Sequence, residues 1–165
     1  LSTTGFILSI PEKAQAGRAK FYFDRAFKKG ENGDYYGAIS DFTKVIELNP
    51  KDAVAYYNRG WNKGKLKDYY GEISDYNKAI EIDPNYKRAY FNRGLSKSDL
   101  KDYYGAISDY IKAIELDPTY IKAYINRSIA KERIGDINSA CSDAKKAVSL
   151  GHTASDNQTW IQKNC

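Results

Sequence analysis

The sequence predicts an all-α fold, a solenoid of paired helices, on three observations. The segment AYYNRG at 55–60 recurs as AYFNRG at 89–94 and as AYINRS at 123–128, each copy 34 residues after the last. Within a copy, small and apolar residues keep the three- and four-residue spacing of a helix face, with one short polar break. Three copies end near a Pro. A period of this length, filled by two helices, is typical of stacked helix pairs.

Length and composition limit the classes of function. The chain has 165 residues, of which 42% are hydrophobic and 28% charged, which is enough for one ordinary core and too little for two domains. No apolar run is long enough to predict a membrane span. The net charge of +5 is a mild excess without the clustered basic surface of a nucleic-acid binder, so we expect no nucleic-acid partner.

The first element, residues 1–16, has the pattern of a secretory signal. The mostly apolar stretch LSTTGFILSI precedes Pro11 and the small-residue pattern Ala-Gln-Ala at 14–16, which is typical of a signal-peptidase site before Gly17. We therefore expect residues 1–16 to be a signal-peptide remnant and the protein to be periplasmic or secreted. The alternative is a cytoplasmic protein in which this segment extends the first helix.

Four helix pairs follow within residues 17–152, one in each copy of the repeat. The expected units are 19–52, 53–86, 87–120 and 121–152. The second helix of each unit should begin after an Asp, because a short carboxylate accepts the unpaired amides of a first helical turn. These capping residues are Asp34, Asp68, Asp102 and Asp136. Pro should stop that helix in three units, at Pro50, Pro84 and Pro118.

The last element, residues 153–165, has the pattern of a short helix that caps the stack. Trp160 and Ile161 would cover the apolar face that the last unit leaves open. Cys141 stands where the other units have Ile, so it should be buried beneath this cap. In an oxidising compartment we expect Cys141 and Cys165 to form a disulfide worth about 3 to 3.5 kcal/mol. In the cytoplasm the two would remain thiols.

The repeat resembles the tetratricopeptide repeat family, and its Asn-Arg-Gly sequence resembles a bacterial variant of that repeat. Counted from the start of each unit, the fourth residue is Tyr, the eighth is small, the twentieth is Ala in three units and the thirty-second is Pro in three. The resemblance covers residues 19–152. It implies a right-handed α-solenoid that binds other proteins and catalyses no reaction.

Three departures from the family pattern carry expectations of their own. An Arg and an Asp recur once per unit and should form a ladder of partly exposed ion pairs, each worth about 0 to 1 kcal/mol. The pairs are Arg25 with Asp41, Arg59 with Asp75, Arg93 with Asp109 and Arg127 with Asp143. A lysine row is expected either to be solvated or to receive an acidic partner. It consists of Lys29, Lys63, Lys97 and Lys131. Glu72 replaces a small residue, so the second unit should loosen there or the carboxylate should turn to solvent.

No catalytic, metal or cofactor site is indicated. His152 is the only His and stands where the other units have Pro, which predicts a loop residue. No spacing of Cys and His suits zinc, and no Gly-rich loop would hold a phosphate. We therefore expect neither enzyme activity nor a cofactor.

The resemblance implies that the first helix of each unit lines a concave groove. The fifth and ninth residues of every unit face that groove and are apolar, although packing does not require it. An Asn row runs beside them and should bond to an extended peptide or, alternatively, bridge adjacent helices. The expected groove residues are Phe23, Phe27, Tyr57, Asn58, Trp61, Arg88, Phe91, Asn92, Leu95, Lys122, Ile125, Asn126 and Ile129. Tyr56 is expected to point away from the groove, into the helix interface.

These observations predict a scaffold, monomeric or weakly self-associating, whose groove binds a peptide or helix of another protein. One subclass of the family binds the carboxylate termini of chaperones through Lys, Asn and Arg side chains. Of the places that it uses, only Asn58 matches here and Arg88 is a partial substitute, so this use is not expected. The alternatives are anion or nucleic-acid binding through the lysine row, and a self-assembling structural element.

Overall fold

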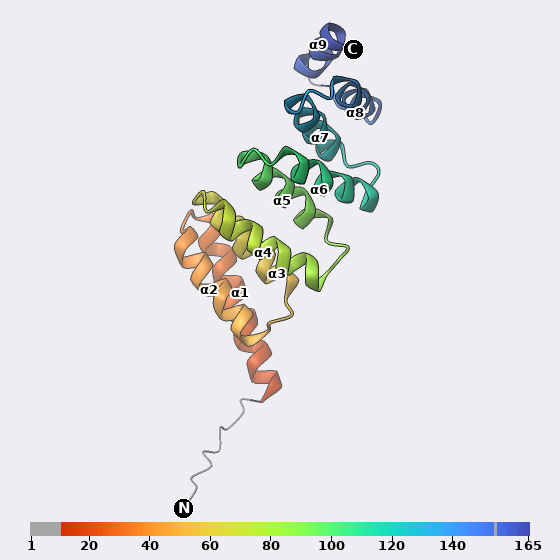
Figure 1. Cartoon of the computed structure of the whole chain (residues 1–165). Helices are drawn as coiled ribbons and strands as arrows, with labels where there is room; N and C mark the ends of the chain where they lie inside the picture. The colour runs from red at the N-terminus through yellow and green to blue at the C-terminus, as the bar shows by residue number, and fades with distance from the viewer. Residues whose placement is uncertain (1–10, 154) are drawn as a thin grey trace, which may run out of the picture.

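The structure, a computed structural model, describes residues 11–153 and 155–165. The regular secondary structure of this part consists of nine α-helices (Figure 1). They are α1 (Glu12–Glu31), α2 (Tyr35–Leu48), α3 (Ala53–Lys65), α4 (Tyr69–Ile82), α5 (Lys87–Asp99), α6 (Tyr103–Leu116), α7 (Ile121–Arg133), α8 (Ile137–Ser149) and α9 (Ser155–Asn164). The predicted all-α solenoid of helix-turn-helix units is confirmed.

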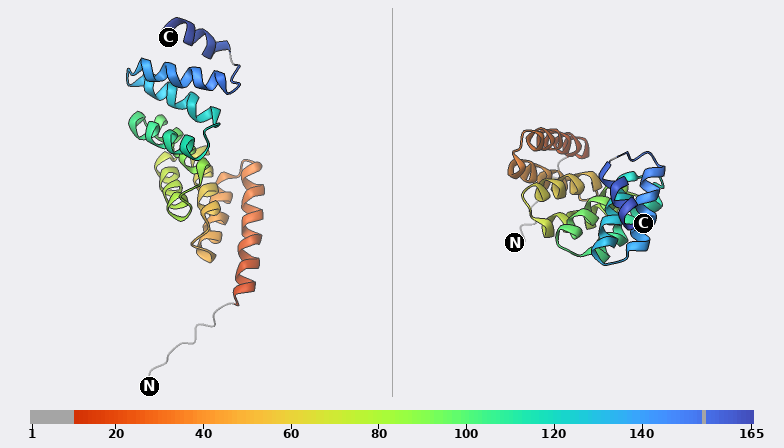
Figure 2. Two further views of the ribbon diagram at one scale, coloured as in Figure 1. Left: turned by 90° about the vertical axis from the view of Figure 1, so that its right-hand side faces the viewer. Right: turned by 90° about the horizontal axis from the view of Figure 1, so that it is seen from above.

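The helices stack in chain order. Consecutive helices pack on each other, and α1 also contacts α3 as α5 contacts α7. Figures 1 and 2 show the stack running from α1 and α2 at one end to α9 at the other. Because these contacts join each unit only to the next one, the core is a row of small clusters along the solenoid.

A tight turn joins the two helices of each unit. The Asp carboxylate before the second helix accepts the amide three residues on, at O···N distances of 2.9 to 3.2 Å, as predicted. Lys67 and Lys101 in these turns have φ angles of 62° and 63°, where the first and fourth units have Gly33 and Gly135. This left-handed conformation favours Gly, because a Cβ crowds the neighbouring carbonyl oxygen.

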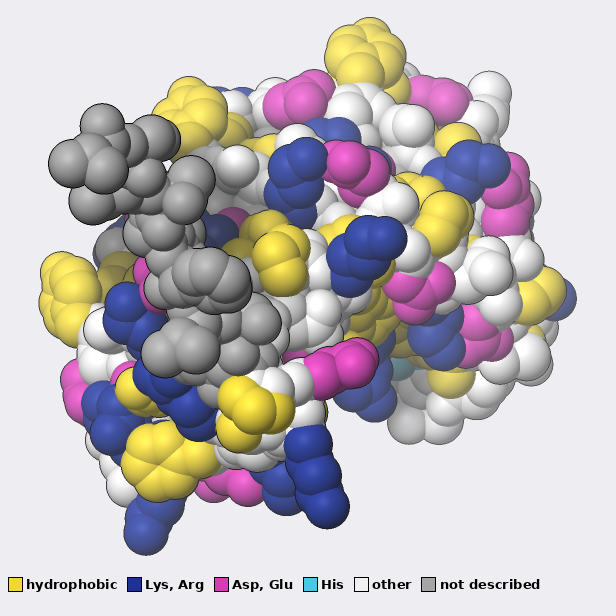
Figure 3. Space-filling model, turned by 90° about the horizontal axis from the view of Figure 1, so that it is seen from below, with side chains coloured by type: hydrophobic (Ala, Val, Ile, Leu, Met, Phe, Trp, Pro, Cys, Tyr) yellow, Lys and Arg dark blue, Asp and Glu magenta, His cyan; other side chains and the backbone are white. Residues whose placement is uncertain are grey.

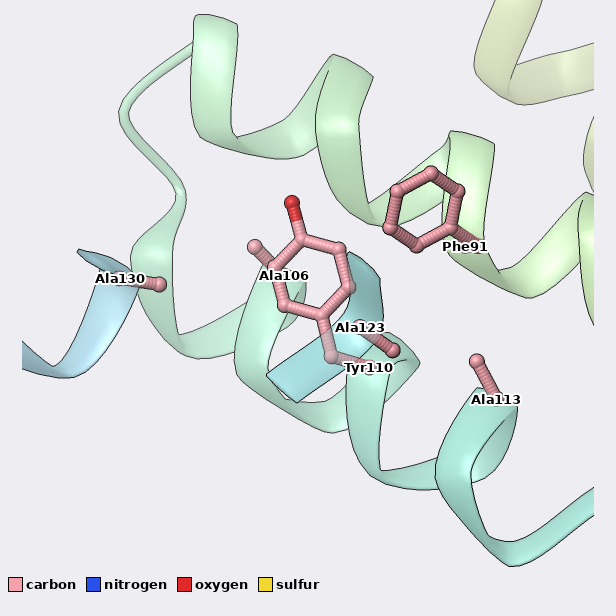
Figure 4. Packing of buried hydrophobic residues seen from close by; sticks show 6 residues of the cluster. All are labelled: Phe91, Ala106, Tyr110, Ala113, Ala123 and Ala130. Carbon is pink, nitrogen blue, oxygen red and sulfur yellow. The ribbon is translucent and has the colours of Figure 1, made fainter. Parts of the chain in front are cut away.

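The core of the third unit shows how the helices of a pair come together. Tyr110 is completely buried against Gly94, where an added Cβ would lie 2.7 Å from the ring. Phe91 packs on the same ring, with centroids 5.8 Å apart (Figure 4). Four alanines complete the cluster, namely Ala106, Ala113, Ala123 and Ala130. Two of these come from α7, so the cluster joins the third unit to the fourth.

The predicted ladder of Arg and Asp pairs is confirmed, and its carboxylates are more deeply buried than expected. In the third unit, Asp109 is only 2% exposed and accepts Arg93 Nε at 2.9 Å and Nη2 of the same guanidinium. The same two-pronged contact recurs in every unit. Each Arg also lies over a Tyr ring of its own helix, as Arg93 does over Tyr90 at 5.4 Å.

The lysine row belongs to this ladder. The expectations that it is solvated or receives an acidic partner are therefore both wrong. Each Lys Nζ lies 2.8 to 2.9 Å from the Asp that pairs with the Arg of its unit. These side chains are 17 to 33% exposed, so they are neither freely solvated nor left for an acidic partner. One buried carboxylate therefore holds two cations in each unit. In the first unit, hydrogen bonding from Arg25 lowers the pKa of Asp41.

Glu72 also differs from the expectation, because it neither turns to solvent nor separates the helices. It is 9% exposed and accepts the hydroxyl of Tyr76 at 2.9 Å. Gly64 leaves room for it, since a Cβ at that position would lie 2.4 Å from Glu72 Oε1. Burial raises the pKa of the Glu72 carboxyl above its ordinary value.

The helix α9 lies against α8 at the end of the stack. A disulfide joins Cys141 of α8 to Cys165 just beyond α9, and Cys141 is buried, as expected. Trp160 is partly exposed and donates its indole N–H to Glu132 at 3.0 Å. The cap is therefore held by one covalent bond and by a polar contact to α7.

At the other end, α1 is longer than the first helices of the later units. Its first five residues include the Ala-Gln-Ala pattern, and Gln15 Nε2 donates to the carbonyl of Leu48 at 2.8 Å. Residues 1–10, the rest of the expected signal-peptide remnant, lie outside the described residues. Cleavage before Gly17 stays a prediction, and it would remove this hydrogen bond.

Candidate protein-binding groove

Three adjacent hollows lie along the side of the solenoid formed mainly by α1, α3, α5 and α7. We name them the Phe27 hollow (about 340 Å³), the Glu72 hollow (about 240 Å³) and the Arg88 hollow (about 590 Å³). Trp61 lines both the first and second, and Asn92 lines both the second and third. Because neighbouring hollows share lining residues, we call the three hollows together the groove.

The Phe27 hollow lies between α1 and α3 and has aromatic walls. Phe27 and Trp61 are 50% and 37% exposed, whereas Phe42 behind them is buried. The remaining lining residues are Gly30, Glu31, Tyr57, Asn58 and Asn62. Large apolar side chains exposed at the edge of a hollow are typical of a surface that a partner covers.

The Glu72 hollow is the next one along and carries two carboxylates. Glu72 and Asp99 line it, together with the apolar side chains of Trp61 and Leu95. Lys65 lines the same hollow and places its Nζ 4.7 Å from the centre of the Trp61 ring. The Trp61 ring is therefore already in a cation–π contact with a lysine of the same chain.

The Arg88 hollow lies between α5 and α7 and combines basic groups with rings. Lys87, Arg88 and Lys122 line it, beside Tyr57 and Tyr120. Lys87 Nζ lies 2.5 Å from Oδ2 of Asp117, which is in the α6–α7 linker, and the two form an ion pair. Arg88 and Lys122 are exposed, and neither forms an ion pair within the part of the chain that the structure describes. This hollow therefore presents a net positive charge.

The structure brings most of the expected groove residues together. Nine of them line the three hollows: Phe27, Tyr57, Asn58, Trp61, Arg88, Phe91, Asn92, Leu95 and Lys122. Phe23 lines a separate hollow of about 720 Å³ between the start of α1 and the end of α2. Ile125, Asn126 and Ile129 line none of these four hollows, although Ile129 is 46% exposed.

Two of the expected aromatic contact residues are part of the packing instead. Phe91 is 7% exposed and packs on Tyr120, with ring centroids 5.0 Å apart. Tyr57 is partly buried and stacks on Tyr86 at 4.9 Å. Tyr56, expected to be buried, is likewise only partly so. The distinction between a groove residue and a core residue is therefore less sharp than the repeat pattern suggests.

The Asn row is already engaged within the chain. Asn92 Nδ2 donates to the hydroxyl of Tyr57 at 2.8 Å, which bridges α5 and α3 as in the alternative interpretation. Asn58 and Asn126 donate to the carbonyls of Val54 and Lys122 one turn earlier in their own helices. An incoming peptide would have to use the amide oxygens or replace these bonds.

Sequence reasoning missed several residues of the groove. Tyr86 and Tyr120 stack against it from the linkers before α5 and α7, and Lys87 begins α5. The two tyrosines recur 34 residues apart, which is a signal that the sequence does contain. The sequence marks Glu72 only as a departure from the repeat, because the residues around it come from three helices.

Comparison with known proteins decides the family. The tetratricopeptide repeat models match residues 19–52, 53–86 and 88–120, which is more than half of the chain. The chain belongs to the tetratricopeptide repeat family. A search of curated protein sequences finds no significant match. As a family, these repeats are generally a non-enzymatic fold for protein interaction.

Solved structures of the same family are similar in fold. A crystal structure of MamA is 26% identical, with a TM-score of 0.79 over 84% of this chain and 81% of that chain. The first such domain of Spaghetti (RPAP3), bound to an HSP90 peptide, is 26% identical, with a TM-score of 0.70 over 72% of this chain and 94% of that one. The Arabidopsis OM64 domain, at 23% identity, has a TM-score of 0.69 over 72% of this chain and 98% of its own.

The remaining features of the described part of the chain are its surface charge, its helix lengths and its potential metal ligands. Seen from the α1 end, Lys and Arg side chains alternate with Asp and Glu side chains over the visible described surface (Figure 3). No helix in the described part of the chain is both long and apolar enough to cross a membrane. No group of three or more His, Cys, Asp or Glu residues in that part could hold a metal ion.

Proposed function

We propose that the groove binds a segment of a partner protein. The observation that carries this proposal is the exposure of Phe27 and Trp61 at the wall of a hollow, where the repeat fold does not need large apolar side chains. Burial of such rings by a partner is the usual source of affinity at an interface. That the related Spaghetti domain holds an HSP90 peptide supports this use of the fold.

The Arg88 hollow indicates the charge of that segment. Arg88 and Lys122 face solvent beside aromatic rings, and an acidic group on the partner would pair with them in a partly desolvated place. The lysine row offers no comparable site, because each of its ammonium groups is held by an Asp. We therefore favour a partner segment with apolar side chains at the Phe27 hollow and a carboxylate at the Arg88 hollow.

We also propose that the protein is exported. A disulfide persists in an oxidising compartment and is rare in the cytoplasm, and the Cys141–Cys165 bond agrees with the signal-like start of the chain. Mass spectrometry of native material tests this, with a chain that begins at Gly17 as the expected result. Native chains that keep residues 1–16 would contradict it.

Crosslinking in the native host tests the groove. A photoreactive residue at Phe27 or at Trp61 should capture the same partner chain, because both line one hollow. The control is Tyr70 on α4, which is 77% exposed and lines none of the described hollows. Ala substitution at Arg88 should weaken capture from the first two positions. Equal capture of that chain from position 70 would contradict the proposal.

A further inference from the structure

The Phe27 hollow contains a buried polar group without a partner. Asn62 is 2% exposed, and its Nδ2 donates to the backbone carbonyl of Asn58 at 2.8 Å. Its Oδ1 accepts no hydrogen bond from any described residue. Turning the amide around would place this oxygen against the Asn58 carbonyl, so the assignment is fixed by that bond. A buried acceptor without a donor is costly, and it needs an explanation.

The later units show which donor the first unit lacks. In the second unit the hydroxyl of Tyr76 donates to Glu72, and in the third the hydroxyl of Tyr110 lies 3.3 Å from Ser98 Oγ. The residue at the same repeat position in the first unit is Phe42, which lines the same hollow as Asn62. The Phe27 hollow thus combines a polar acceptor on the first helix of the second unit with a ring of the first unit that has no hydroxyl.

Gly30 makes room for the unpaired oxygen, which packs directly against it. A Cβ at Gly30 would lie 2.9 Å from Asn62 Oδ1, and Gly30 lines the Phe27 hollow as well. The aromatic walls of the hollow include the rings of Phe27 and Trp61, which are 50% and 37% exposed. An apolar hollow with one placed polar group is typical of a site that binds a side chain or small ligand.

We infer that this hollow receives an aromatic side chain with a hydrogen-bond donor, Tyr or Trp, from the partner segment. Its O–H or N–H would donate to Asn62 Oδ1, while its ring packs on Phe27 and Trp61. A Phe would match the walls and leave the acceptor unpaired. A Lys would have to bring its charge into a hollow lined by four aromatic rings, which costs more than placing a neutral donor there. The inference rests on the proposed function, since it names what enters the groove at this point.

Two small probes test the inference without the partner. N-acetyltyrosinamide and N-acetylphenylalaninamide differ only in the hydroxyl, and the indole N–H signal of Trp61 reports on the hollow in an NMR titration. The chain has two Trp residues, so the signal of Trp160 on α9 is an internal control. We expect the Tyr probe to shift the Trp61 signal with an affinity about threefold to tenfold higher than that of the Phe probe, the worth of one neutral hydrogen bond.

Two substitutions remove the preference from opposite sides. Asn62→Leu deletes the acceptor, and Phe42→Tyr supplies a hydroxyl from within the chain. Both variants should bind the two probes equally, and Phe42→Tyr should also raise the urea midpoint, because it satisfies the buried oxygen. Phe23→Tyr is the matched control, since Phe23 lies near Phe42 but lines another hollow. It should keep the preference of the wild type.

The outcomes separate this inference from the proposed function. Equal affinity of wild type for both probes, or a preference that survives both Asn62→Leu and Phe42→Tyr, would show that the oxygen is satisfied by water and would overturn the inference. No shift of the Trp61 signal with either probe would overturn it too. In either case, crosslinking from Phe27 in the native host still tests whether the groove binds a protein.

Discussion

The buried carboxylate of the ion-pair ladder should contribute far more to stability than a surface ion pair, and Asp109→Asn tests this. Asp109 is 2% exposed and is contacted by Arg93 and by Lys97, whose side chains are 17% and 22% exposed. The substitution keeps the shape of the side chain and removes its charge. Arg93 and Lys97 would then contact a neutral amide instead of a carboxylate. Little water could reach them to replace the lost negative charge.

The magnitude follows from the burial. Breaking a buried ion pair by removing one partner costs about 3 to 5 kcal/mol, and the partial exposure of both cations places the expected cost at about 3 kcal/mol. With a urea slope near 2 kcal/mol per M, the midpoint would fall by about 1.5 M. The loss is a large part of the 5 to 15 kcal/mol that is typical of a domain, so the variant should fold but less stably.

The same helix provides a matched control. Glu115 on α6 pairs with Lys112, and both side chains are more than half exposed. Glu115→Gln makes the same chemical change and should cost at most about 0.5 kcal/mol. Urea unfolding followed by circular dichroism at 222 nm measures both variants. If Asp109→Asn and Glu115→Gln differ by less than about 1 kcal/mol, the ladder is no more than surface charge and the reasoning is wrong.

Four further predictions test other parts of the structure. Burial raises the pKa of Glu72, so the folded state binds its proton more tightly: the free energy of unfolding of the wild type relative to Glu72→Gln should be highest below pH 4.5 and fall as the pH rises through the folded-state pKa. Tyr57→Ala should cost about 2 to 3 kcal/mol because its ring is stacked, whereas Trp61→Ala should cost about 1 kcal/mol or less, both measured by urea unfolding. Lys101→Gly should raise the free energy of unfolding by about 0.5 to 1 kcal/mol in the same assay, since it relieves a left-handed φ. Reduction of the disulfide should remove the hydrogen-exchange protection of α9 and leave that of α1 to α6 unchanged, because the bond closes a terminal loop.

The local features of the fold could be predicted from the sequence because each depends on a few neighbouring residues. The Asp caps, the Pro stops and the pairing of Arg with Asp follow from positions that recur with the repeat. The partners of the lysine row could not be predicted from the recurring positions alone. Whether Lys97 reaches solvent or Asp109 depends on the distance between α5 and α6, which the repeat pattern does not give.

The groove was less predictable for a similar reason. The repeat position predicts that Phe91 and Trp61 face the same side, yet Phe91 is buried by Tyr120 of the next linker and Trp61 is not. Glu72 packs against Gly64 of another helix, and that contact is visible only once the helices are placed. Contacts between successive units, rather than the pattern within one, decide which side chains a partner can reach.

The most direct test of the central claim is hydrogen exchange on the non-covalent complex with the partner that crosslinking identifies. If the groove is the binding surface, amide protection on binding should increase in α1, α3 and α5, and Trp61→Ala together with Arg88→Ala should abolish the effect without unfolding the chain. Protection confined to α2, α4 and α6, or unaffected by those two substitutions, would place the partner on the other side of the solenoid and contradict the account.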